Sequence, residues 1–128
     1  MKIRWLDRRV AKPGPYLALC LSEKDFLAAM KHCKIKQPPD WIKTPQAHAT
    51  THFLVHDNGD TVCVICMRSW EGRDPIEVAG LLIHEAVHVW QEYAAVMGEQ
   101  NPGSEQEAYA IQAIAQELMA EFARRMAE

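Results

Sequence analysis

Two histidines four residues apart, with a glutamate directly after the first, form an H-E-x-x-H motif at His84, Glu85 and His88. Residues four apart on an α-helix project from the same face, with Cβ atoms about 5–6 Å apart. Both imidazoles can therefore bind one zinc ion at ~2.0–2.1 Å. Glu85 lies ~100° around the helix from His84, where its carboxylate can act on a water molecule without binding the metal. The motif predicts a metal site with a general base beside it.

The residues around the motif favour the helix that this chemistry needs. Asp74 is a good N-cap, Pro75 suits the first helical position, and Glu77 completes a capping box. Gly98 stands where a C′ glycine ends a helix. Most residues between these signals are apolar, so we predict a largely buried helix over residues 75–97. Burying two histidines and a glutamate without partners is costly, and a metal ion relieves that cost.

A catalytic zinc ion usually takes three protein ligands and one water molecule, and the motif supplies two of the three. No histidine follows His88, so the candidates downstream are the carboxylates of Glu92, Glu99, Glu105, Glu107, Glu117 and Glu121. Glu105 and Glu107 stand at the start of the last predicted helix, which can fold back against the motif helix. Glu107 completes an S-x-x-E capping box with Ser104, which gives it a structural role. Glu105 has no such role beyond a favourable place at the helix N-terminus.

The motif and the later glutamate together resemble the gluzincin branch of the zincin metallopeptidases. In that branch the third ligand opens an E-x-x-(small)-x sequence on a second helix, and residues 105–109 (EQEAY) are similar. The resemblance implies a zinc ion held by His84, His88 and Glu105, with Glu107 as the alternative third ligand.

The resemblance covers about residues 76–122. Within it, the pairing of residues 84–91 (HEAVHVWQ) with residues 105–112 (EQEAYAIQ) also resembles small zincin-like proteins of phages and bacteria. Several gluzincins place an aspartate where this chain has Tyr109, to orient a ligand histidine. That orienting partner must therefore come from elsewhere in this chain.

Two hypotheses about function follow from the resemblance and from the size of the chain. The first is a zinc-dependent peptidase that acts on a peptide or protein substrate. Zinc acidifies its bound water towards a pKa of ~7, and Glu85 takes the proton as general base and returns it to the leaving amine. The second is a zincin-like domain that keeps the metal but serves as a binding or regulatory module, because so small a chain has no second domain to wall a cleft. In such a module Glu85 is dispensable.

Cys63 and Cys66 offer a different zinc site. With the two motif histidines they spell C-x2-C-x17-H-x3-H, close to a structural Cys2His2 site. Residues three apart on a strand point to opposite faces, however, so both thiols reach one ion only from a turn. The spacing is also longer than usual, and Glu85 would have no task. We therefore expect buried, inert cysteines.

Several other residues could support the site. His48, His52 and His56 would share one side of a strand, and we interpret them as histidines on the sheet surface. One of them could still donate to a transition-state oxyanion. Trp90 and Gln91, just past the motif, are expected to pack and to support the metal ligands rather than to catalyse.

Length and composition bound the class of protein. The 128 residues suit one domain, residues 1–128, with a single core. A net charge of -3 and a pI near 6.1 argue against a nucleic-acid partner, which would normally leave a basic face. The apolar runs are too short to span a membrane, and residues 1–10 lack the apolar stretch of a signal peptide. We therefore expect a cytoplasmic protein with reduced thiols.

The first part of the chain alternates between strand and helix signals. Residues 12–15 indicate a turn or linker, and residues 16–21 (YLALCL) form a short apolar run that predicts a strand. Ser22 is placed to cap a helix that has Asp25 at its third position. Residues 41–46 are expected to be irregular.

Two β-rich runs follow, over residues 48–56 and 61–69, and the Asn-Gly pair between them is a strong hairpin signal. These elements predict an α+β fold. It comprises a small, mainly antiparallel sheet that includes the hairpin over 51–56 and 61–68, covered by the helices over 75–97 and 105–126.

Overall fold

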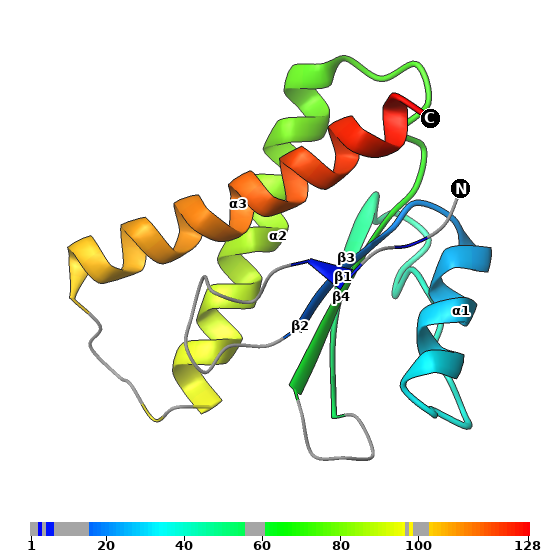
Figure 1. Cartoon of the computed structure of the whole chain (residues 1–128), viewed down its shortest axis with the longest axis horizontal. Helices are drawn as coiled ribbons and strands as arrows, with labels where there is room; N and C mark the ends of the chain where they lie inside the picture. Colours follow the sequence, from blue (N-terminus) through cyan, green and yellow to red (C-terminus); the bar gives the residue numbers. More distant parts are fainter. Residues whose placement is uncertain (1–2, 4, 7–15, 56–60, 97, 99–102) are drawn as a thin grey trace.

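The computed structural model describes residues 3, 5–6, 16–55, 61–96, 98 and 103–128. Its elements, in chain order, are β1 (Trp5–Leu6), β2 (Tyr16–Cys20), α1 (Glu23–His32), β3 (Ala49–Val55), β4 (Thr61–Met67), α2 (Pro75–Val96) and α3 (Ser104–Met126). Figure 1 shows the sheet between two layers of helix, with α1 on one face and α2 and α3 on the other. The predicted α+β class is confirmed.

The four strands are ordered β1-β2-β4-β3. Strand β1 pairs with β2, and β3 with β4, in antiparallel fashion, whereas β2 and β4 are parallel. The sheet is mainly antiparallel, as predicted, but its central pair is parallel, and no local signal in the sequence reveals that pair. Strand β3 lies at one end of the order, so among the described strands only β4 pairs with it.

The predicted hairpin is confirmed as strands β3 and β4. They pair from Val55 opposite Thr61 to Ala49 opposite Met67. The predicted Asn-Gly turn lies outside the described residues, as does the turn predicted over residues 12–15. Strand β1 has no counterpart in the sequence analysis, because two residues are too few to show a period.

Each face of the sheet carries its own apolar cluster. Leu17 and Ile65 belong to the cluster under α2 and α3, whereas Val64 belongs to the cluster under α1, together with Phe26. Because successive strand residues point to opposite faces, strands β2 and β4 are covered on both sides and read as nearly continuous apolar runs. No described helix is long and apolar enough to cross a bilayer.

The predicted N-caps of the first two helices are confirmed. The Oγ of Ser22 accepts from the backbone N–H of Asp25 at 3.1 Å at the start of α1. The Oδ1 of Asp74 accepts from a first-turn N–H of α2 at 2.8 Å. Glu77, which was expected to close the capping box, instead accepts from Nη1 of Arg73 at 3.2 Å.

Further contacts lie just before and just after the motif helix. Before α2, Nε1 of Trp70 donates to the carbonyl of Leu21 at 2.8 Å, and its ring lies edge-on to that of Phe122. After α2, Gly98 has a φ of +76°, and its N–H donates to the carbonyl of Ala95 at 3.0 Å. Gly98 therefore ends the helix as predicted, because glycine adopts this left-handed conformation without a Cβ penalty.

The prediction that α2 is largely buried is wrong. Its buried side chains form one stripe: Val78, Leu82, Glu85, Ala86, Val89, Trp90 and Ala94. By contrast Ile76 is 81% exposed and Val96 is 69% exposed, and both motif histidines are exposed. Apolar composition overestimates the burial of α2 because only part of its circumference meets the sheet and α3.

The capping box predicted for α3 is also wrong. Ser104 is the first helical residue, and the N-cap position belongs to Gly103, which has no side chain to cap with. The side chain of Glu107 accepts from Nε1 of Trp90 at 2.8 Å. Glu107 therefore has a structural role, but that role is to tie α3 to α2.

Candidate metal centre

Helix α2 brings the Nε2 atoms of His84 and His88 to 3.2 Å from each other. Two nitrogens that each lie ~2.0–2.1 Å from a tetrahedral zinc ion are about 3.3–3.4 Å apart. The side chain of His84 is 66% exposed, so an ion can reach the pair from solvent. The separation, the donor type and the access all fit one zinc ion.

A neighbouring amide orients one of these histidines. Gln91 places its Oε1 3.2 Å from Nδ1 of His88. Because a carbonyl oxygen can only accept, Nδ1 carries the proton and Nε2 presents its lone pair towards His84. Gln91 thus supplies the orienting partner that the sequence does not provide at Tyr109, which is 66% exposed on α3.

The side chain of Glu85 projects from α2 towards β3 and is buried, with only 4% of the residue's surface exposed. The hydroxyl of Thr51, on β3, donates to Oε1 of Glu85 at 2.7 Å. The other oxygen, Oε2, lies 3.8 Å from Nε2 of His84. The carboxylate is therefore held through one oxygen and presents the other towards His84.

Two adjoining hollows meet at His84 and Glu85 and follow α2 along β3. The first, of about 380 Å³, lies towards the end of α2 and includes Lys43, Thr51, Phe53, His88, Gln91 and Glu92 in its lining. The second, of about 510 Å³, lies towards the start of α2 and includes Ala47, His48, Arg73, Glu77, Gly80 and Leu81. We call the two together the α2–β3 groove.

The prediction that His48 and His52 share one side of the sheet is wrong. His48 precedes β3 and lines the groove, with its Nδ1 3.3 Å from Nη2 of Arg73. His52 is buried on the opposite side, where its ring packs against α1 and its Nε2 donates to the carbonyl of Trp41 at 2.9 Å. His56 lies outside the described residues.

The third ligand implied by the family resemblance does not lie beside the histidines. Among the described residues, the close group of possible ligands holds only the three motif residues. Glu105 is exposed in the first turn of α3, and Glu107 is bonded to Trp90. Trp90 is two positions after His88, so it projects from nearly the opposite side of α2. Glu92 lines the groove without joining the group. The assignment of Glu105 as a ligand stays a prediction.

The Cys2His2 alternative does not fit the strand geometry. Cys63 packs in the cluster under α2 and α3, whereas Cys66 packs in the cluster under α1. Burial raises the pKa of Cys63 to about 12, and the carboxylate of Glu92 acts in the same direction. Burial also raises the pKa of Cys66, as does its hydrogen bond with Cys20. All four cysteines are buried, and the burial of Cys63 and Cys66 agrees with the prediction.

Comparisons with known proteins identify no relative. No protein-family model matches the chain, and neither a curated protein nor a solved structure matches it significantly. The resemblance to zincins therefore stays a prediction from the sequence motif.

Two residues of this site, Thr51 and Lys43, were not predicted from the sequence. Thr51 lies in the β-rich run over residues 48–56, where alternation along the strand places it on the same face as Phe53. Nothing local indicates that this face meets Glu85. Lys43 lies in the segment predicted to be irregular, where the sequence offers no periodicity from which to place a side chain.

Proposed function

We propose that this protein is a zinc-dependent metallopeptidase, with His84 and His88 as metal ligands and Glu85 as general base. The observation that carries the proposal is the pair of Nε2 atoms 3.2 Å apart beside a buried carboxylate with one oxygen left towards them. A cation at this position also offsets the unfavourable burial of that carboxylate.

Zinc, when bound, polarises a carbonyl oxygen and lowers the pKa of a water molecule towards ~7. The chain's own groups do the rest. His84 and His88 hold the ion, and Gln91 keeps His88 in the tautomer that leaves Nε2 free. Glu85 accepts a proton on Oε2 while Thr51 holds Oε1, and the same carboxyl returns the proton to the leaving amine.

The α2–β3 groove suits an extended peptide. Strand β3 is the last in the sheet order, so beyond its contacts with Lys43 the outer edge can offer backbone groups to a further strand. The two hollows lie on either side of Glu85, which leaves room for substrate residues before and after the scissile bond. A peptide or protein is therefore the substrate class that we propose.

A second candidate is a metal-binding module without catalysis. One observation favours it: among the described residues, no third protein ligand accompanies the two histidines. A partner protein could complete the coordination of such a site. In that case the metal mediates binding, and the carboxylate of Glu85 has no chemical task.

The test compares wild-type protein with Glu85→Gln. Wild-type protein should carry about one zinc ion per chain and should cleave members of a broad peptide library in a zinc-dependent manner. Glu85→Gln retains an oxygen acceptor for Thr51 and should keep its zinc, while cleavage falls by ~10²–10⁴-fold. Glu71→Gln, which changes an exposed glutamate in the loop before α2, is the matched control and should cleave as wild type does.

Two results would overturn the peptidase. If wild type cleaves nothing while a partner protein binds wild type and Glu85→Gln equally, the binding module is the better account. If added zinc neither binds nor changes the melting temperature, both candidates fail.

A further inference from the structure

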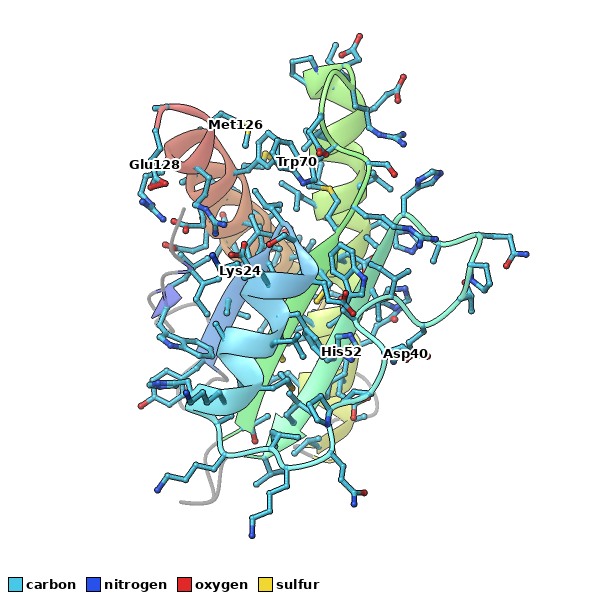
Figure 2. All side chains as sticks on the ribbon, turned by 90° about the vertical axis from the view of Figure 1, so that its right-hand side faces the viewer. Lys24, Asp40, His52, Trp70, Met126 and Glu128 are labelled. Carbon is cyan, nitrogen blue, oxygen red and sulfur yellow. The ribbon has the colours of Figure 1, made fainter. Side chains whose placement is uncertain are left out.

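Residues 41–47 form a loop without regular secondary structure that is nevertheless held against the sheet. Nε of Arg68, just after β4, donates to the carbonyl of Ala47 at 2.9 Å. At the other end of the loop, Nε2 of His52 donates to the carbonyl of the first loop residue at 2.9 Å. Figure 2 shows the chain after Asp40 passing beside His52. The loop is thus fixed along β3.

This loop places Lys43 in the wall of the α2–β3 groove. The backbone N–H of Lys43 donates to Oγ1 of Thr50 at 3.1 Å, and its Nζ donates to the carbonyl of Thr51 at 3.4 Å. Within the part of the chain that the structure describes, none of the ion pairs involves Lys43. Its ammonium is therefore available to an anion that enters the groove.

Thr51 connects this ammonium with the general base. Its carbonyl accepts from Lys43, and its hydroxyl donates to Glu85. Thr51 alone therefore lies between the ammonium of Lys43 and the carboxylate of Glu85, with a hydrogen bond to each. Because one residue of an extended peptide spans ~3.3–3.6 Å, a group bound to Lys43 lies within about one or two residues of a carbonyl beside Glu85.

The charges in this hollow favour an anion at Lys43 only when a metal ion is bound. Glu85 and Glu92 place two carboxylates there against a single ammonium. A divalent cation on the two histidines reverses the sign of the total. The 3.4 Å bond from Lys43 to a neutral carbonyl is long compared with an ammonium–carboxylate bond of ~2.7–2.9 Å. A carboxylate can therefore displace the carbonyl when the metal is bound.

We propose that Lys43 binds a carboxylate of the substrate, so that the groove selects peptides with a free carboxylate within one or two residues of the scissile bond. This inference rests on the proposed peptidase function and names the substrate class of that same site. The carboxylate can come from the C-terminus of the peptide or from an Asp or Glu side chain, since both offer the same group to the ammonium.

A binding experiment tests the subsite without turnover. Fluorescently labelled tetra-alanine with a free C-terminus, its C-terminal amide, and amidated versions carrying Asp or Asn are titrated with zinc-loaded Glu85→Gln protein. Neutralising the carboxylate should weaken binding about tenfold, as expected for one partly exposed charge-assisted hydrogen bond. Adding Lys43→Met should abolish this preference, whereas Lys43→Arg should retain most of it. Lys24→Met, on α1, is the matched control and should change nothing (Figure 2).

The peptide pairs distinguish the two sources of the carboxylate. A Lys43-dependent gain from the free C-terminus identifies an enzyme that trims peptide ends, and a gain from Asp identifies preference for acidic side chains. Either result supports the proposal. Equal affinity for charged and neutral peptides, no measurable binding of any of them, or a preference that survives Lys43→Met overturns it.

Turnover separates this inference from the proposed function. If wild type cleaves charged and neutral peptides equally well, the peptidase stands and the carboxylate subsite falls. If peptides bind in a Lys43-dependent manner but none is ever cleaved, the subsite stands and the peptidase falls. Zinc-free protein should lose most of the preference, because Glu85 and Glu92 then leave the hollow anionic.

Discussion

Two clusters of charged side chains join distant parts of the described chain, and they differ in how far their polar atoms are paired within the protein. The candidate metal centre combines the motif residues of α2 with Thr51 of β3 and opens onto the α2–β3 groove. The other cluster, which we call the Arg125 cluster, joins Asp25 of α1 to Glu121 and Arg125 of α3.

The Arg125 cluster is closed to solvent. Arg125 is completely buried, forms an ion pair with Asp25, and donates from Nη1 to the carbonyl of Leu19 at 3.2 Å. Glu121 places Oε2 3.9 Å from the same nitrogen, and Asp25 also accepts from the N–H of Leu21 at 3.1 Å. Figure 2 shows the end of α3 beside the start of α1, the two elements that this cluster joins.

In the candidate metal centre each side chain is hydrogen-bonded by its neighbours on one side only. Thr51 holds one oxygen of Glu85, and Gln91 holds one nitrogen of His88, while the opposite atoms face the groove. A buried charge must find its counter-charge within the protein, whereas an open site can leave that place to a ligand. Nε of Arg125 also has no hydrogen-bond partner within the described part of the chain, but it is buried. The comparison teaches that the same residue types stabilise the fold or can bind a ligand according to whether their unpartnered atoms are buried or face an open groove.

Removing the charge of Arg125 should have the largest effect on stability. Arg125→Met leaves the buried carboxylate of Asp25 without its cation, whereas Glu121 keeps its ion pair with Arg124, so the free energy of unfolding should fall by about 3–5 kcal/mol. Urea denaturation measures the change, and Lys24→Met, at the exposed start of α1, is the control. Zinc content at temperatures where the variant stays folded should be that of wild type. A loss no larger than the control's would contradict the structural role of the cluster.

Zinc binding at the candidate metal centre should have the next largest effect on stability. Zinc at 100 times its Kd should raise the free energy of unfolding by ~2.7 kcal/mol, and a chelator should reverse the gain. Thermal melts with and without zinc measure it. His88→Ala should remove the response, whereas Cys63→Ser with Cys66→Ser should keep it, because these thiols lie on opposite faces of β4. Loss of zinc in the cysteine variant would restore the Cys2His2 scheme.

Glu105 and Glu107, both in the first turn of α3, should separate a role in the fold from a role in the site. Glu107→Gln weakens the bond to Nε1 of Trp90, so the free energy of unfolding should fall by about 1 kcal/mol while zinc affinity stays the same. If Glu105 is the third ligand that the family resemblance implies, Glu105→Gln weakens zinc binding and leaves the metal-free protein as stable as wild type. Zinc titration calorimetry and urea denaturation on both variants separate the two roles. The reverse order of zinc affinities would show that the family resemblance misassigns the third ligand.

His52, which belongs to neither cluster, should have the smallest effect. Burial lowers the pKa of His52 from its ordinary value of 6.5; the bond to Trp41 opposes this shift, and the charge of Lys43 adds to it. The unfolded chain therefore takes up a proton at higher pH than the folded one, and the free energy of unfolding falls as the pH drops below about 6.5. His52→Gln should flatten this slope in denaturation measurements between about pH 5 and 8. An unchanged slope would assign it to other groups.

The sequence by itself determined the features that depend on near neighbours. The spacing of His84 and His88 places both on one helix face, and Ser22 and Asp74 cap their helices as expected. The β3–β4 hairpin was likewise predictable. All of these involve residues within one helical turn or one tight turn of each other, where backbone geometry leaves few alternatives.

Predictions from the sequence were wrong where a local signal competes with a tertiary contact. Glu107 matches a capping box, but the indole of Trp90 provides a donor from another helix. The apolar composition of α2 suggested burial on all sides, although Ile76 and the motif histidines face solvent. Local patterns contain no information about which side of a helix a neighbour covers.

Only the tertiary structure decided how the site and the fold are completed. The register of β3 against α2 brings Thr51 to Glu85, and the packing of α3 brings Arg125 to Asp25, 100 residues earlier in the chain. Lys43 reaches the groove because its loop is fastened along β3. Such contacts gain free energy only after the sheet and helices have packed, so no short stretch of sequence contains a signal for them.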